Sequence, residues 1–141
     1  MKAIQIIFSP TGGTRKIAEA ITSQWDIPVN EIDLTNAQND FSVVDFTGDD
    51  VAVISVPSYG GRVPALAAER IKRIHGNGTC CIIVCVYGNR AYEDTLVELN
   101  DIAEQSGFHV VAAVGAVAEH SIMHQYATGR PDQQGRRELQ S

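Results

Sequence analysis

The segment Ser9-Pro10-Thr11-Gly12-Gly13-Thr14 combines hydroxyl side chains with two adjacent glycines, directly after an apolar run. Where such a segment opens a helix, the glycines leave backbone N–H groups accessible and the hydroxyls add further donors. The composition therefore predicts a loop that binds a phosphate group through amides and hydroxyls, with no lysine among its residues. A Ser/Thr helix cap followed by a tight turn would give a similar pattern and remains the alternative.

Three well-known phosphate-handling motifs do not match this loop. A Walker loop requires Gly-Lys-Ser/Thr, whereas Gly13 is followed by Thr14 and Arg15. A dinucleotide-binding fingerprint requires three spaced glycines, and the segment has only two. A phosphatase built on such a loop would need a nucleophilic cysteine, which the segment lacks. We therefore expect the loop to hold a phosphate by hydroxyls and amides alone.

Two further loops have compositions suited to a planar ligand. Pro57-Ser58-Tyr59-Gly60-Gly61-Arg62 places an aromatic ring beside two glycines, which let the backbone approach a ring closely and allow its peptides to rotate. Tyr87-Gly88-Asn89-Arg90-Ala91-Tyr92 again sets a glycine between aromatic and amide-bearing residues. Taken singly, each loop could be an ordinary turn. Three such loops at one edge of a sheet would be far more specific than any one of them.

The elements that must position these loops alternate between apolar runs and segments of helical period. Strands are expected over residues 2–8, 29–33, 51–56, 80–86 and 108–117, the last of these being the final strand. Helices are expected over 15–25, from Pro64 to about 74, and over 92–103, with Gly107 as the stop signal. Strands that are apolar on both faces are typical of a parallel sheet covered by helices on both sides. The chain is therefore predicted to be a three-layer α/β sandwich with five parallel strands, whose ligand lies at the C-terminal ends of the strands.

The composition is that of one ordinary globular domain over residues 1–141. Within it, we expect residues from about 130 to 141 to be a closing helix or the start of a linker. Hydrophobic residues make up 44% and charged residues 20%, which excludes wholesale disorder. No apolar run reaches the ~20 residues of a membrane span, and no signal peptide opens the chain. The formal net charge of -6 argues against a nucleic-acid partner, because nucleic-acid surfaces need clustered Lys and Arg.

The cysteines and histidines do not suggest a metal site. Cys80, Cys81 and Cys85 fall within one expected strand, so we expect buried core thiols in a reducing cytoplasm rather than disulfides or metal ligands. His120 and His124 have a chelating spacing for a helix, but no third ligand accompanies them. A place for His120 at the fringe of the ligand site is the better interpretation, because it follows the last expected strand.

Together the three loops resemble those of a known family. The segment Phe8-Ser9-Pro10-Thr11-Gly12-Gly13-Thr14 is similar to the phosphate loop of flavodoxins, and the other two loops are similar to those in the flavodoxin half of bacterial flavodoxin–ferredoxin fusion proteins. The resemblance covers the whole chain and implies a flavodoxin-like sheet of order 2-1-3-4-5. It implies an electron carrier that binds FMN, with the phosphate in the first loop and the isoalloxazine between the other two. The cofactor-binding residues so implied are Ser9, Thr11, Gly12, Gly13, Thr14, Pro57, Ser58, Tyr59, Gly60, Gly61, Arg62, Tyr87, Gly88, Asn89, Arg90 and Tyr92.

Two features depart from that family. Many flavodoxins place a tryptophan in the second loop, whereas Trp25 ends the first expected helix here, so Tyr59 takes over the stacking role. The Cys-x-x-Cys series of an iron–sulfur half is missing, so the chain is either an excised domain or a short free-standing relative. The resemblance implies redox partner proteins, of which a ferredoxin-like iron–sulfur domain is one candidate.

Other functions of the same fold stay open at this point. An FMN-dependent reductase would take electrons from a nicotinamide donor and pass them to a quinone or another small acceptor, and Arg62 and Arg90 are the loop residues that could bind the dinucleotide. A binding module without flavin is the third class. In an electron carrier, the same two arginines would attract the negative charge of the reduced flavin. They would thereby raise the reduction potential of the semiquinone/hydroquinone couple. The simpler alternative is that they point into solvent and pair with Glu93 or Asp94.

Overall fold

A computed structural model of the chain describes residues 2–10, 12–35, 46, 49–59, 61–87, 92–117, 122–127 and 137–140. In chain order its elements are β1 (Ala3–Ile7), α1 (Gly13–Thr22), β2 (Val29–Asp33), β3 (Val51–Pro57), α2 (Ala65–Ile71), β4 (Cys80–Tyr87), α3 (Tyr92–Gln105), β5 (His109–Val117), β6 (Ile122–Ala127) and β7 (Arg137–Gln140).

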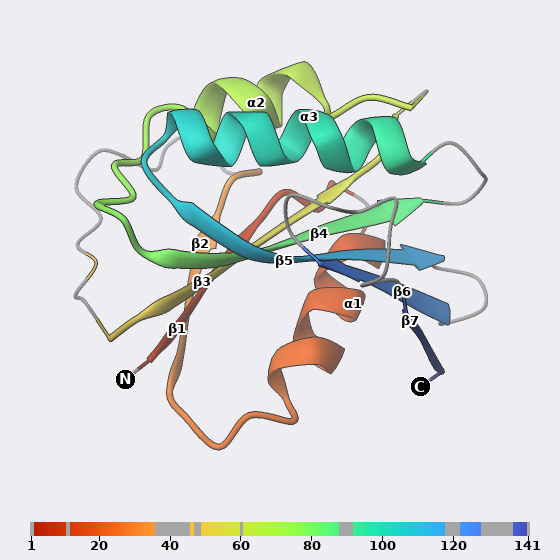
Figure 1. Ribbon diagram of the computed structural model, residues 1–141, viewed down its shortest axis with the longest axis horizontal. Helices are drawn as coiled ribbons and strands as arrows, with labels where there is room; N and C mark the ends of the chain where they lie inside the picture. The colour runs from red at the N-terminus through yellow and green to blue at the C-terminus, as the bar shows by residue number, and fades with distance from the viewer. Residues whose placement is uncertain are drawn as a thin grey trace.

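The described strands form one sheet in the order β2-β1-β3-β4-β5-β6-β7. Strands β1 to β5 are all parallel, which confirms the expected order 2-1-3-4-5. Helix α1 covers one face of the sheet, and α2 and α3 cover the other, as Figure 1 shows. The result is the predicted three-layer α/β sandwich. Because the five strands are parallel, the segments that follow β1, β3 and β4 all leave the sheet on the side where the strands have their C-terminal ends.

The burial of the strands explains why they are apolar on both faces. Successive side chains of a strand point to opposite faces. In β3, Ile54 is fully buried in the core cluster formed with α2 and α3, whereas its neighbour Val53 is fully buried in the cluster that includes Ile17 of α1. Strand β2 lies at the edge of the sheet and exposes its first three residues, which accounts for its more polar sequence.

The C-terminal part of the sheet differs from the prediction. Strand β5 was expected to be the last, but β6 pairs antiparallel with it, and β7 pairs antiparallel with β6. Strand β6 covers an edge of β5 that would otherwise present unpaired backbone groups. The closing helix considered for the C-terminal segment is not formed over Arg137–Gln140, because these residues are strand β7.

The three expected helices are present with shifted ends. Helix α1 begins two residues earlier than predicted, at Gly13, and ends at Thr22, so that Trp25 lies beyond it and packs half-buried against the core cluster on the α1 face. Helix α2 starts directly after Pro64. Helix α3 ends before Gly107, whose φ of 95° confirms it as the stop. None of the helices in the described part of the chain has the length and apolarity that a membrane span requires.

Candidate functional site

The first two candidate loops leave neighbouring strands and lie at the same edge of the sheet. Strands β1 and β3 pair directly, and the Phe8 N–H donates to the Ser55 carbonyl at 3.0 Å, which continues the ladder beyond β1. The third loop follows β4, the next strand on. Its first residue, Tyr87, ends β4 and is buried, and the backbone of Tyr92 begins α3. Gly88, Asn89 and Arg90 lie outside the described residues.

The first loop presents the N-terminus of α1 without obstruction. Gly12 precedes the helix with φ 90° and ψ −14°, and its carbonyl accepts the Lys16 N–H at 3.1 Å. A Cβ added at Gly12 or Gly13 would meet no atom within 4 Å among the described residues, so the space before the helix is open. No hydrogen bond to another described residue takes up the N–H groups of Gly13 and Thr14. Thr11 lies outside the described residues.

The first turn of α1 favours an anion in this open space. It holds no acidic residue that would compete with a bound anion. The N–H groups of Gly13 and Thr14, which bond to no described residue, and the positive end of the helix dipole both attract negative charge. Of the predicted ligands in this loop, the structure thus brings together Gly12, Gly13 and the buried Thr14.

Ser9 has a structural role in this loop. Its Oγ accepts the Arg15 N–H at 3.1 Å, although the N-cap residue of α1 is Gly12, which has no side chain for the expected Ser/Thr cap. Its own N–H donates to Thr35 Oγ1 at 2.9 Å. Among the described residues the Ser9 hydroxyl acts only as an acceptor, toward Arg15, so its proton could be donated to a ligand.

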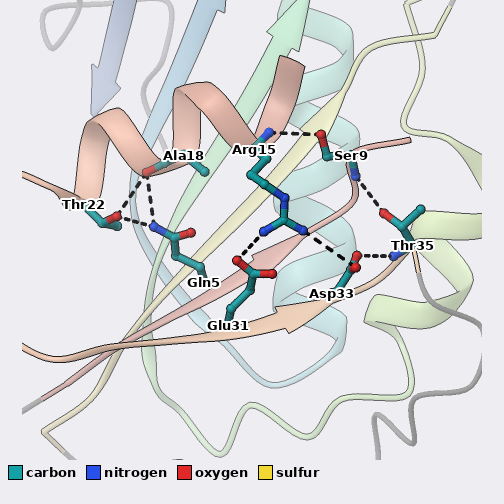
Figure 2. A network of polar contacts seen from close by, with 8 residues as sticks. All are labelled: Gln5, Ser9, Arg15, Ala18, Thr22, Glu31, Asp33 and Thr35. Carbon is teal, nitrogen blue, oxygen red and sulfur yellow. Dashed lines mark hydrogen bonds and ion pairs between the residues drawn. The ribbon is translucent and has the colours of Figure 1, made fainter. Parts of the chain in front are cut away.

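Ser9 is one member of a closed ring of polar contacts, which Figure 2 shows. Thr35 donates its N–H to Asp33 Oδ1 at 2.9 Å, and Asp33 Oδ2 lies 3.7 Å from the guanidinium of Arg15. Arg15 also donates to Glu31, a contact that raises the pKa of the guanidinium. Arg15 therefore directs its charge at the carboxylates of β2, and its backbone N–H closes the ring at Ser9. The ring ties the first loop to the ends of β1 and β2.

Two buried side chains extend this framework. Arg70 of α2, 8% exposed, donates to the Leu34 carbonyl and, at 3.2 Å, to the Thr35 carbonyl, and so holds the turn after β2. At the other end of α1, the Gln5 side chain of β1 donates to the Ala18 carbonyl at 3.2 Å, also drawn in Figure 2. Sequence reasoning missed Thr35 and Arg70, because both act through contacts between residues far apart in the chain.

The second loop forms a tight turn. The Tyr59 N–H donates to the Arg62 carbonyl at 2.9 Å, and the Arg62 N–H donates to the Tyr59 carbonyl at 3.1 Å. Gly61, inside the turn, has φ 81°, a backbone conformation that residues other than glycine rarely adopt. Backbone rotation was also expected at Gly60, which lies outside the described residues. The Tyr59 side chain is 50% exposed, so its ring is accessible for stacking on a planar ligand.

Helix α3 holds this loop on both sides of the turn. Ser58 Oγ lies 2.8 Å from Thr95 Oγ1. Glu98 accepts from Arg62 Nε at 3.0 Å and Nη2 at 3.2 Å, and from the Val63 N–H at 2.9 Å. The hydrogen bond from Arg62 lowers the pKa of Glu98. Arg62 thus pairs with Glu98, one turn further along the helix than the expected partners Glu93 and Asp94, whose side chains the structure does not describe.

The cysteines differ in environment. Cys81 and Cys85 are buried as expected, and burial raises the pKa of the Cys85 thiol to about 12. Cys80 is exposed, which corrects the prediction of three core thiols. It is the first residue of β4, at the exposed beginning of the strand. The described residues gather no group of three His, Cys, Asp or Glu side chains that could hold a metal. His120 lies outside the described residues.

Comparison with known proteins supports the fold. No protein-family model matches the chain, and none of the curated proteins matches it. A flavodoxin of Streptococcus pneumoniae TIGR4 is 18% identical, with a TM-score of 0.62 over 83% of this chain and 84% of that one. An NADH:FMN oxidoreductase, EMOB, is 16% identical, with a TM-score of 0.66 over 84% and 76% of the two chains. Flavodoxin 1 of Bacillus cereus is 15% identical, with a TM-score of 0.57 over 83% and 86%. At these identities the likeness establishes a flavodoxin-like α/β fold.

Proposed function

We propose that the chain binds FMN and carries electrons between redox partner proteins in the cytoplasm, as flavodoxins do. The observation that carries the proposal is the pairing of two features on neighbouring strands. One is the N-terminus of α1, where a Cβ at Gly12 or Gly13 would meet no described residue, and the other is the glycine turn beside the exposed Tyr59. A phosphate and a planar ring joined in one molecule match this pairing.

The residues present fit FMN. The N–H groups of Gly13 and Thr14 would hold the phosphate, together with the hydroxyls of Ser9 and Thr14. Tyr59 and the backbone of its turn would lie against the isoalloxazine. When bound, FMN supplies the one- and two-electron chemistry, and the protein supplies binding, orientation and electrostatics.

The comparisons are consistent with this proposal, since flavodoxins and FMN-dependent enzymes are among the proteins that share the fold. The finer resemblance of the loops to the flavodoxin half of flavodoxin–ferredoxin fusions rests on the sequence. It favours an iron–sulfur protein as one of the redox partners.

A second candidate is an FMN-dependent oxidoreductase that accepts electrons from NAD(P)H. An open groove of about 780 Å³ adjoins Tyr59, and Arg62, Lys72 and Arg73 contribute to its lining. Arg62 and Arg73 pair there with Glu98 and Glu69, so Lys72 is the cation that would attract the phosphates of a dinucleotide beside the flavin. The NADH:FMN oxidoreductase and an azoreductase, AzrA, share the fold.

The absorption spectrum of the purified protein tests the proposal. We expect the two visible bands of bound flavin and the release of FMN on denaturation, identified by chromatography against FMN, FAD and riboflavin. A colourless protein that takes up no added FMN would contradict the proposal. Oxidation of NADPH by the isolated protein with a quinone, at a rate well above that of free FMN, would favour the oxidoreductase over the carrier.

A further inference from the structure

The loop after β3 is anchored to α3 at two points that flank its turn. On the N-terminal side, Ser58 Oγ lies 2.8 Å from Thr95 Oγ1. On the C-terminal side, Glu98 Oε1 accepts the Val63 N–H at 2.9 Å. Thr95 and Glu98 are three residues apart on α3, so they share one face of the helix. Both anchors therefore come from a single rigid element.

The anchor at Glu98 is directional, although the Arg62 side chain is exposed. Arg62 Nε donates to Oε1 at 3.0 Å and Nη2 donates to Oε2 at 3.2 Å, which is a two-point pairing of a guanidinium with a carboxylate. Such pairing fixes geometry more closely than a single ionic contact. The same carboxylate thus holds both the side chain of Arg62 and the backbone of Val63.

The anchor at Thr95 cannot easily yield. Thr95 is fully buried, and so is Cys85 of β4, while the Thr95 hydroxyl contacts that of Ser58. Between the two anchors, the loop exposes Tyr59 and Arg62, and Gly61 is half-buried. Conformational change in this loop is therefore confined to the turn, where Gly61 has a positive φ.

We propose that Thr95 and Glu98 are positioning residues that hold the two ends of the turn between Ser58 and Val63 against α3, and that this restraint makes the protein discriminate between oxidised and reduced FMN. The inference rests on the proposed function for its ligand. Helix α3 also begins directly after the loop that follows β4, so one helix links both loops assigned to the isoalloxazine. The shape and protonation of the ligand change with its redox state. The protein has different affinities for the two states only if the surrounding structure resists adjusting to each of them.

The first test needs no cofactor. Amide hydrogen exchange is measured on the flavin-free protein for wild type, Glu98→Ala and the control Glu69→Ala. Glu69 is a carboxylate of the neighbouring helix that pairs with Arg73 at 2.7 Å. We expect the amides of Arg62 and Val63 to exchange at least tenfold faster in Glu98→Ala and at the wild-type rate in Glu69→Ala. Unchanged exchange in Glu98→Ala would overturn the anchor.

The second test measures how well the loop discriminates redox states. The affinities for oxidised and fully reduced FMN are obtained for the same variants and for Thr95→Val, with Thr95→Ser as the conservative rescue. We expect the ratio of the two affinities to move at least threefold toward one in Glu98→Ala and Thr95→Val, and to stay at the wild-type value in Thr95→Ser and Glu69→Ala. Faster exchange with an unchanged ratio would show that the anchor is merely structural and would overturn the proposal.

Two further outcomes are an unfolded Glu98→Ala variant and a wild-type protein that binds no FMN. If Glu98→Ala does not fold, Glu98→Gln decides, because its amide oxygen can still accept the Val63 N–H while the charged pairing with Arg62 is lost. The Gln variant should show a smaller change of the same sign, and no change in either measurement would overturn the proposal. If wild-type protein binds no FMN in either redox state, the proposed function fails, whereas the exchange data still judge the anchor.

Discussion

The two loops that leave β1 and β3 are both fixed by polar contacts, but they are fixed in different ways. The first loop belongs to a closed ring in which Ser9, Thr35, Asp33 and Arg15 each contact the next. The second is held at its two ends by α3, and the turn between those ends is exposed. The first arrangement suits a group of constant charge, such as a phosphate. The second restrains, from both ends, the turn that would lie against a ligand whose state changes.

The largest effect is expected at Gly12, since it tests the open side of the first loop. Gly12→Ala places a Cβ in the space assigned to the phosphate and strains a residue with φ 90°. Losing a charge-assisted hydrogen bond costs about 1.5–3 kcal/mol, so FMN affinity should fall roughly tenfold to a hundredfold. Fluorescence titration of FMN measures the effect.

Gly78→Ala is the matched control for this prediction. Gly78 has φ 76° and equally open surroundings, but it precedes β4 at the opposite edge of the sheet. The two variants should lose similar stability, and only Gly12→Ala should lose affinity. Equal losses of affinity would show that backbone strain, rather than the phosphate position, is responsible.

A smaller effect is expected when the ring around Ser9 is opened. Arg15→Gln removes the contacts to Glu31 and Asp33, and FMN affinity should fall about twofold to fivefold, in line with the ~1 kcal/mol that a partly exposed ion pair contributes. The control is Lys16→Gln, which removes the same charge from the neighbouring, exposed position of α1. If both variants lose affinity equally, the arginine acts through its charge alone and the ring has no positioning role.

These contacts also mark the limit of what the sequence could predict. The strands, the glycine loop before α1 and the turn after β3 were predictable, because each depends on local patterns of apolar residues and glycines. Thr35, Arg70 and Glu98 were not, since each acts on a residue or carbonyl about 26 to 36 positions away. Nothing in their local sequence distinguishes them from surface residues.

The strands at the C-terminal end were missed for a different reason. The segment Ile122–Ala127 mixes His124 and Gln125 with apolar residues and lacks the continuous apolar run of the parallel strands. An antiparallel strand beside the edge of a sheet needs no such run. Only the pairing with β5, which the fold supplies, identifies it as a strand.

The smallest expected effect concerns Glu98 and pH. The hydrogen bond from Arg62 lowers the pKa of Glu98 in the folded chain below the ordinary value of 4.5. The stability that this carboxylate contributes is therefore complete above that value and is lost as pH falls through the lowered, folded value. Wild type should be more stable than Glu98→Gln at neutral pH, and the difference should shrink in acid.

Denaturant unfolding at a series of pH values measures this difference in unfolding free energy. Glu69→Gln, which loses an exposed ion pair within α2 and its flanking turn, serves as the control. A stability difference between wild type and Glu98→Gln that stays constant down to acid pH would contradict the assigned contact with Arg62.

The central claim, that the open N-terminus of α1 binds the phosphate of FMN, is tested most directly by calorimetric titration of the flavin-free protein with FMN and with riboflavin. The two ligands share the isoalloxazine and differ in the phosphate. We predict that wild type binds FMN at least roughly tenfold more tightly than riboflavin, the difference expected from a charge-assisted hydrogen bond. Gly12→Ala should remove most of that difference while leaving riboflavin affinity unchanged. Equal affinities of wild type for the two ligands would contradict the account.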